Sequence, residues 1–188
     1  VGSEMCIRDS LQGRLPVLPG ALPTLRDWSD HTTTAFPEVR LKKYLEMRGA
    51  DSGPWSRICA LPAFWVGLLY DETALNAAWD LVKDFSLAER NVLRDGVPRQ
   101  AMNLPFRNGT VRDLAREALA ISRDGLRRRA ALNADGQDET RFLDVLQEIV
   151  DSGKTAAERK LELFHGRWNG SVDPCLLYTS PSPRDATL

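Results

Sequence analysis

A run of alternating residues between Glu38 and Arg48 constrains the fold of this chain more than any other feature. The apolar members of the run are Val39, Leu41, Leu45 and Met47. The polar members are Glu38, Arg40, Lys42, Tyr44, Glu46 and Arg48, and Lys43 alone breaks the pattern. Successive side chains of a β-strand point to opposite faces, so the run predicts one long strand with an apolar face in the core and a charged opposite face. The turn residues Gly49, Gly53 and Pro54 are expected to end it.

The chain beyond Pro54 has the periodicity of helices. Apolar residues recur at three- and four-residue steps over 55–70, 73–84, 86–94, 110–131, 138–151 and 155–168. Three of these starts carry a capping box, in which an acidic residue follows Ser or Thr by three positions: Ser86 with Glu89, Thr110 with Asp113, and Thr155 with Glu158. Prolines and glycines between Asp95 and Gly109 predict a loop.

The segment before the strand is expected to be mostly irregular. Residues 11–23 contain three prolines and two glycines, which is typical of a connector. Thr24 followed by Asp27 predicts a short helix through His31, and Pro37 prevents its continuation. One long strand and about six helices do not make a complete domain, because a strand needs partners. We therefore expect an α+β fragment whose remaining sheet lies in an absent amino-terminal part.

Composition narrows the classes of partner and compartment. The chain has 188 residues and a net charge of −1, which argues against nucleic acid or an anionic membrane as its main partner. The longest apolar run, 58–70, contains Pro62 and is shorter than the ~20 residues of a membrane span, so it predicts a buried helix. Three cysteines without CxxC spacing do not form a disulfide framework. These features favour a reducing, intracellular setting.

The two ends of the chain differ from the rest. Residues 1–10 have no hydrophobic stretch that could serve as a signal peptide, and residues 175–188 end in a Ser/Pro pattern without periodicity. Both resemble translated sequencing-adapter readthrough. We therefore expect a non-native leader at 1–10, a natural segment at 11–174, and a non-native tail at 175–188.

The charged face of the expected strand carries the chemistry. Glu46 and Arg48 are two positions apart, so their side chains leave one face about 7 Å apart. A carboxylate can hold Mg²⁺ against phosphates, and a guanidinium can neutralise charge on a transferred phosphoryl group. The alternative is a solvent-facing strand whose charges pair with their neighbours and contribute little.

An ordered set of residues resembles the plant and proteobacterial type of glutamate–cysteine ligase. Its core is Asp27-Trp28-x-x-His31-x-Thr33-Thr34-x-Phe36-Pro37-Glu38-Val39-Arg40-Leu41-Lys42-x-Tyr44-Leu45-Glu46-Met47-Arg48-Gly49-Ala50-Asp51. It continues through Gly53-Pro54-Trp55, 61–71, Pro105-Phe106-Arg107, Gly166-x-Trp168 and 171–174. The resemblance covers essentially all of residues 11–174 and identifies the chain as the carboxyl-terminal part of such an enzyme.

The resemblance implies a carboxylate–amine ligase related in fold to glutamine synthetase, with ATP and Mg²⁺ as its cofactors. In this group the γ-carboxylate of L-glutamate is phosphorylated, and the amine of L-cysteine attacks the acyl phosphate. The wider group places a Glu-x-Arg on an active-site strand, where Glu binds metal and Arg contacts the phosphoryl group. Glu46-Met47-Arg48 matches that motif. The implied partners are small molecules alone, with neither nucleic acid nor membrane, and the implied location is cytoplasmic.

Further candidates surround this motif. Glu38 is a second candidate metal ligand and Arg40 a second catalytic candidate, although both could form a structural ion pair. Trp28, Thr33, Thr34 and Tyr44 are candidates for the substrate pocket, with packing as the alternative for the two aromatic residues. Arg107 could contact a phosphate from its loop before a helix, or simply lie on a surface loop.

Two other functions remain open from the sequence. The first is a ligase of the same group that couples glutamate to a different amine, because amine selectivity depends on pocket shape. The second is a helical interaction module without catalysis. The Glu46 and Arg48 pair argues against that module, which has no physical need for charges on an interior strand face.

Overall fold

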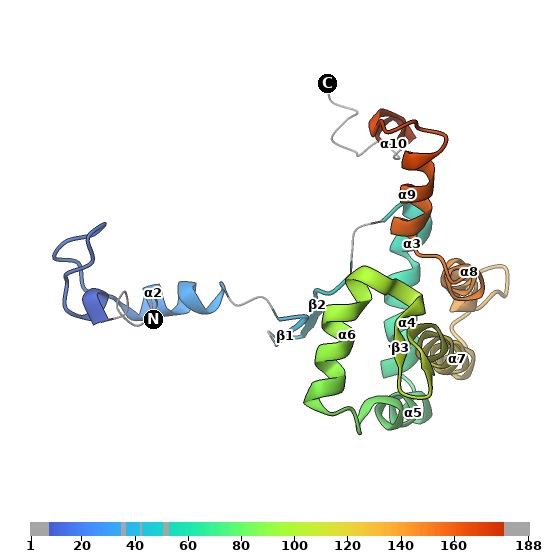
Figure 1. Cartoon of the computed structure of the whole chain (residues 1–188). Helices are drawn as coiled ribbons and strands as arrows, with labels where there is room; N and C mark the ends of the chain where they lie inside the picture. The colour runs from blue at the N-terminus through green and yellow to red at the C-terminus, as the bar shows by residue number, and fades with distance from the viewer. Residues whose placement is uncertain (1–7, 35–36, 42, 51–52, 179–188) are drawn as a thin grey trace. The chain divides into compact units, whose positions relative to one another are not determined.

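The structure, a computed structural model, describes residues 8–34, 37–41, 43–50 and 53–178. It divides the chain into two compact units, residues 1–51 and 52–188, each with helices and one short pair of strands (Figure 1). The expected α+β class is confirmed. Phe36, Lys42 and Asp51 of the quoted motif lie outside the described residues, as do residues 1–7 and 179–188 of the expected non-native ends. The expected domain boundaries stay a prediction.

Helix α2 (Leu25–Thr32) and a β-hairpin are the main elements described in the first unit. Helix α2 begins at the predicted capping box, where the Thr24 backbone N–H donates to Asp27 at 2.7 Å and the Asp27 N–H donates to the Thr24 hydroxyl at 3.3 Å. Strands β1 (Val39–Leu41) and β2 (Leu45–Met47) pair antiparallel, with Arg40 opposite Glu46. The Arg48 N–H donates to the Glu38 carbonyl at 2.8 Å and extends the pairing beyond β2.

The prediction of one long strand is wrong, because the chain reverses between Leu41 and Leu45. Lys43, the residue that breaks the alternation, lies in this reversal. The division into faces survives, since residues directly opposite in an antiparallel pair share a face. The expected burial of the apolar face in the core is also wrong: Leu41 and Leu45 are 80% and 62% exposed.

The second unit is mainly helical. Its helices are α3 (Trp55–Ile58), α4 (Ala60–Leu69), α5 (Glu72–Val82), α6 (Leu87–Gln100), α7 (Val111–Arg129), α8 (Asp144–Ser152), α9 (Ala156–His165) and α10 (Asp173–Tyr178). Two short 3₁₀ turns, η1 (Ala101–Asn103) and η2 (Glu139–Leu143), and the strands β3 (Pro105–Phe106) and β4 (Gly109–Thr110) complete it. The three predicted capping boxes are confirmed at the starts of α6, α7 and α9.

The predicted loop from Asp95 to Gly109 is wrong in its first part. Helix α6 continues through Pro98 to Gln100, and β3 and β4 form a hairpin that ends at Thr110. Proline in a helix removes one N–H donor, and here it lies only two residues before the last residue of the helix. The buried Leu104 packs against Gly96, which anchors this last turn to the segment that follows.

The core of the second unit lies between α4, α7, η2 and α8. Its buried members are Ala63, Leu119, Leu126, Leu143 and Val150. The apolar run expected to form a buried helix is α4, whose Ala60, Ala63, Gly67 and Leu68 are buried. No helix among the described residues is long and apolar enough to cross a membrane.

Helices α4 and α7 cross at a pair of glycines. A Cβ on Gly125 would lie 1.9 Å from the Gly67 carbonyl oxygen, and a Cβ on Gly67 would lie 2.3 Å from the Ser122 carbonyl oxygen. The fully buried Ser122 hydroxyl donates to the Phe64 carbonyl at 2.8 Å, which satisfies its hydrogen bond inside this contact. The two backbones therefore touch where a larger residue has no room.

Candidate functional site

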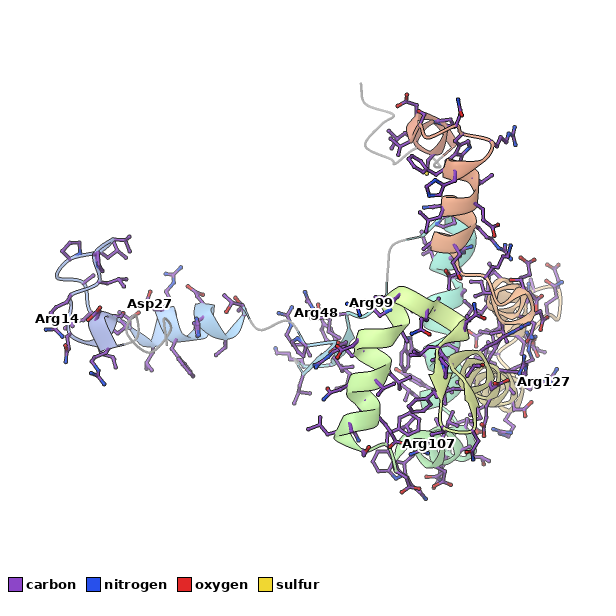
Figure 2. The ribbon with its side chains drawn as sticks, in the orientation of Figure 1. Arg14, Asp27, Arg48, Arg99, Arg107 and Arg127 are labelled. Carbon is purple, nitrogen blue, oxygen red and sulfur yellow. The ribbon has the colours of Figure 1, made fainter. Side chains whose placement is uncertain are left out.

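Three charged side chains meet on the polar face of the first hairpin. The Glu46 Oε2 accepts hydrogen bonds from Arg40 Nε at 2.8 Å and from Arg48 Nη1 at 3.2 Å. Arg40 lies on β1 and Glu46 on β2, and Arg48 is the first residue after β2. Arg48 is labelled in Figure 2. The three side chains are half-buried, with exposed fractions of 21% for Arg40 and 28% for Glu46 and Arg48. We call these residues the hairpin charge cluster.

Opposite charges face each other across this hairpin. Arg40 lies opposite Glu46 in the strand register, and the Glu38–Arg48 backbone bond places those two residues side by side. Opposite-charge pairs directly across a sheet stabilise it modestly, and partial burial reduces their screening by solvent. Arginine side chains also bind oxyanions such as carboxylates and phosphoryl groups. The hairpin charge cluster can therefore stabilise the hairpin and bind an anion.

The sequence predicts that two glutamates, Glu38 and Glu46, bind a metal ion. Mg²⁺ requires near-octahedral oxygen ligands, which proteins supply as one or two carboxylates completed by phosphates and water. In the part of the chain that the structure describes, no group of three or more His, Cys, Asp or Glu side chains could hold a metal. Glu46 bonds two arginines through Oε2, and the described part of this face offers two carboxylates, Glu38 and Glu46, to a metal ion. A metal role for Glu38 and Glu46 stays a prediction.

The expected substrate-pocket residues lie in two places. Trp28 is in α2 and is 65% exposed, with its ring centroid 6.1 Å from that of His31. The Thr33 and Thr34 hydroxyls donate to carbonyls of the same helix, Asp30 and His31, at 2.6 and 2.7 Å. Tyr44 lies in the reversal before β2 and is 61% exposed. Their substrate role stays a prediction. The side-chain hydrogen bonds of the described residues connect the members of the hairpin charge cluster to one another and do not bring these four residues together.

Arg107 lies in the second unit, in the turn between β3 and β4, and is labelled in Figure 2. Its Nε donates to Glu89 at 2.7 Å, its Nη2 donates to the Asp84 carbonyl at 2.9 Å, and its guanidinium lies 4.5 Å from the centre of the Phe85 ring. Its φ of 51° is in the left-handed region, which is uncommon for residues other than glycine. These contacts give Arg107 a structural role that joins the hairpin to the start of α6, and a phosphate contact stays a prediction.

A shallow cavity of about 230 Å³ opens beside Arg107. Apolar side chains from α5, β3 and α7 line it, and Asp113 and Glu117 lie at its polar side. The Asp113 carboxylate already caps α7 and pairs with Arg116. Arg107 and Asp113, two of the charged residues that line this cavity, therefore serve the local fold.

The contact with Arg107 changes the acidity of Glu89. Hydrogen bonds from Arg107, and next from the backbone and side chain of Ser86, lower the pKa of Glu89 from 4.5 to about 2. A depressed folded-state pKa stabilises the fold above the unfolded value, and this stabilisation is lost as pH falls. We expect Glu89→Gln to lower the stability of the chain at neutral pH, with a gap to wild type that narrows between pH 4.5 and about 2. Urea unfolding across this pH range measures it.

Glu162→Gln is the matched control for this pH series. Glu162 forms an ion pair with Lys154, and both side chains are more than half exposed. Exposed ion pairs contribute little to the free energy of unfolding, so the stability of Glu162→Gln should equal that of the wild type at every pH. A Glu89→Gln gap that stays constant through the acid range would contradict the assigned contact.

Residues 5–177 match glutamate–cysteine ligase family 2 in a comparison with known protein families. The chain is 54% identical over 169 residues to the chloroplastic glutamate–cysteine ligase of Medicago truncatula, covering 90% of this chain and 32% of that protein. It is 52% identical over 170 residues to the chloroplastic enzyme of Arabidopsis thaliana, covering 90% of this chain and 31% of that protein. For chloroplastic glutamate–cysteine ligase A of Oryza sativa subsp. indica, the identity is 54% over 170 residues, with 90% and 33% covered.

These similarities bear on the length and the location of the protein. The chain spans about a third of the length of the curated relatives it matches. The expectation of a cytoplasmic protein is contradicted, because the relatives are named chloroplastic and so point to a plastid. The cysteine spacing indicates only a reducing environment. Such an environment does not distinguish the cytoplasm from other reducing compartments of the cell.

Proposed function

This chain belongs to glutamate–cysteine ligase family 2, and from that premise we propose that it is part of an enzyme that joins the γ-carboxylate of L-glutamate to the amine of L-cysteine. The family match over residues 5–177 carries this proposal. The chloroplastic names of the relatives support a plastid location for the full-length protein. Its substrates are small molecules: L-glutamate, L-cysteine and ATP.

The proposed reaction has two steps. A γ-carboxylate oxygen of glutamate attacks the γ-phosphorus of ATP, which gives γ-glutamyl phosphate and ADP. The amine of cysteine then attacks the acyl carbon, inorganic phosphate leaves, and the nitrogen loses a proton. Negative charge collects on carboxylate and phosphoryl oxygens in both steps, and Mg²⁺ supplies charge neutralisation when it is bound.

Arg48 and Arg40 are the residues of this chain that we assign to the developing charge. Two guanidinium groups on one hairpin face can stabilise an oxyanion more strongly in the transition state than in the substrate. We assign Trp28, Thr33, Thr34 and Tyr44 to the substrate pocket; the exposed rings of Trp28 and Tyr44 support this, because they are accessible to a ligand. The remaining contacts to nucleotide and metal are assigned to the rest of the full-length protein.

The chain alone is expected to have no ligase activity, because a third of the enzyme does not bring ATP, glutamate and cysteine together. ADP release with glutamate and cysteine, together with chromatographic detection of γ-glutamylcysteine, measures it. The full-length protein in the same assay is the positive control. A full-length protein that releases ADP only with a different amine would overturn the assignment of cysteine.

A further inference from the structure

Arg57, on the short helix α3, has a buried hydrogen-bond donor that no described residue accepts. Its Nε is the one buried side-chain nitrogen or oxygen without a hydrogen-bond partner among the described residues. The Arg57 backbone N–H, in contrast, donates to the Pro54 carbonyl at 2.8 Å. A buried donor without an acceptor costs free energy, and native proteins rarely keep one. The local fold therefore does not account for the Arg57 side chain.

The other half-buried arginines have protein acceptors. Among the described residues, those whose side chains donate to a carboxylate, a carbonyl or a hydroxyl are Arg40, Arg48, Arg112, Arg123 and Arg159. Arg57 is also half-buried, and its Nε has no such acceptor. This difference separates Arg57 from the arginines whose contacts serve the local fold.

The stem of the Arg57 side chain lies against the preceding turn. A Cβ on Gly53 would lie 3.4 Å from the Arg57 Cβ and 3.5 Å from its Cδ, so the stem is in close contact with that part of the backbone. A stem packed in this way restricts the guanidinium, and a restricted group loses less entropy when it binds a ligand. Nε and one terminal nitrogen together offer two donors to a carboxylate. The donor edge of Arg57 is therefore suited to a bidentate carboxylate.

We propose that Arg57 binds the α-carboxylate of an amino-acid substrate, L-glutamate or L-cysteine, through Nε and one terminal nitrogen. The proposal rests on the proposed ligase function. Both amino acids carry an α-carboxylate that neither step of the reaction changes. Arg40 and Arg48 are assigned to the charge that develops on reacting oxygens, so the α-carboxylate needs a cation of its own. Arg57 supplies that cation together with an unbonded donor.

The constant charge of the α-carboxylate gives Arg57 a kinetic signature. The carboxylate has the same charge in the bound substrate and in the transition state, so Arg57 stabilises both equally. Loss of such uniform binding raises KM and leaves kcat nearly unchanged. Arg57 therefore differs from Arg48, whose replacement is expected to lower kcat.

Arg57→Met in the full-length enzyme tests this signature, because methionine keeps an unbranched stem and removes the charge and the donors. The KM for glutamate or for cysteine should rise roughly tenfold or more, the usual effect of losing a hydrogen bond to a charged group. The KM for ATP and kcat should stay within about threefold of wild type. The melting temperature without substrates should be equal or higher, because a buried unbonded donor has been removed. Steady-state kinetics and a melting curve measure these quantities.

Arg123→Met is the matched control. Arg123 is a half-buried arginine of the same unit, and it pairs with Asp144 at 3.3 Å. Its replacement should leave all three KM values unchanged. Two substrate analogues identify the carboxylate: γ-aminobutyrate is glutamate without the α-carboxylate, and cysteamine is cysteine without it. The loss of kcat/KM caused by Arg57→Met should disappear with the analogue that lacks the bound group.

The same measurements can overturn the proposal. Unchanged KM values for both amino acids would do so, and a lower melting temperature would then assign Arg57 to an ion pair with a carboxylate of the protein. A KM raised for ATP alone would indicate a phosphate ligand and would also overturn it. Arg57→Lys, which loses the planar fork, gives the same KM comparison if Arg57→Met does not fold. A wild-type enzyme without ligase activity would refute the proposed function instead, and calorimetric binding of glutamate and cysteine would still test Arg57.

Discussion

Gly125→Ala is expected to destabilise the helical unit severely. The new Cβ would lie 1.9 Å from the Gly67 carbonyl oxygen and 2.9 Å from the Cβ of Ala74. Backbone atoms of a packed helix do not move aside as a flexible side chain does, so α4 and α7 must separate. Overpacking of this kind costs at least about 3 kcal/mol, which corresponds to a melting temperature lower by roughly 10 °C or more. Thermal unfolding followed by circular dichroism measures the change.

Two other glycines serve as comparisons for this substitution. A Cβ on Gly53 meets only ordinary contacts with Arg57 at 3.4 and 3.5 Å, so Gly53→Ala should leave the melting temperature almost unchanged. A Cβ on Gly96 meets the Leu104 side chain at 2.5 Å, and a side chain can adjust, so Gly96→Ala should be intermediate. Alanine favours a helix over glycine by about 1 kcal/mol, which opposes the expected loss. A melting temperature for Gly125→Ala equal to that of Gly53→Ala would refute the close helix crossing.

Arg48→Lys in the full-length enzyme is expected to lower kcat by about 10²–10³-fold, the usual effect of removing one preorganised donor to a transition-state oxyanion. Lysine keeps the positive charge but loses the planar fork and the fixed hydrogen bond to Glu46. Stability should change little, because the charge remains beside the carboxylate. Steady-state kinetics with glutamate, cysteine and ATP, together with a melting curve, measures both quantities.

The control for this substitution is Arg127→Lys. Arg127 lies on α7 and forms an exposed i, i+3 pair with Asp124 (Arg127 is labelled in Figure 2). That pair is expected to contribute little to stability, and Arg127 is not part of the hairpin charge cluster. The kcat of Arg127→Lys should therefore equal the wild-type value. An Arg48→Lys enzyme with near wild-type kcat and a normal fold would remove Arg48 from the mechanism.

Much of the helical unit can be predicted from the sequence because its helix starts depend on local chemistry. A capping box needs only residues three positions apart, and those at Ser86, Thr110 and Thr155 are each found in the structure. The end of α6 is not predicted, because Pro98 and the nearby glycines resemble loop residues. The contact between Gly96 and Leu104 outweighs that local signal, and no pattern of neighbouring residues reveals it.

The candidate site can be predicted only in part. Period two assigns Glu46 and Arg48 to one face correctly, since the register of the hairpin preserves that division. Period two does not distinguish one strand from two strands joined by a short reversal, so it does not reveal the pairing of Arg40 with Glu46. The sequence does contain one signal for the reversal: Lys43 is charged at a position where the alternation calls for an apolar residue. The contacts of Arg107 depend on residues 18 and 23 positions away, which sequence spacing does not relate.

The small size of the first hairpin bears on the proposed binding of an oxyanion by Arg40 and Arg48. Strands β1 and β2 have three residues each, and a two-stranded sheet by itself is only marginally stable in water. An anion can use Arg40 and Arg48 together only in molecules whose strands are paired. The apparent dissociation constant is then the intrinsic one divided by the fraction of paired molecules. Any part of the full-length protein that stabilises strand pairing would therefore tighten the proposed oxyanion binding without touching the ligand.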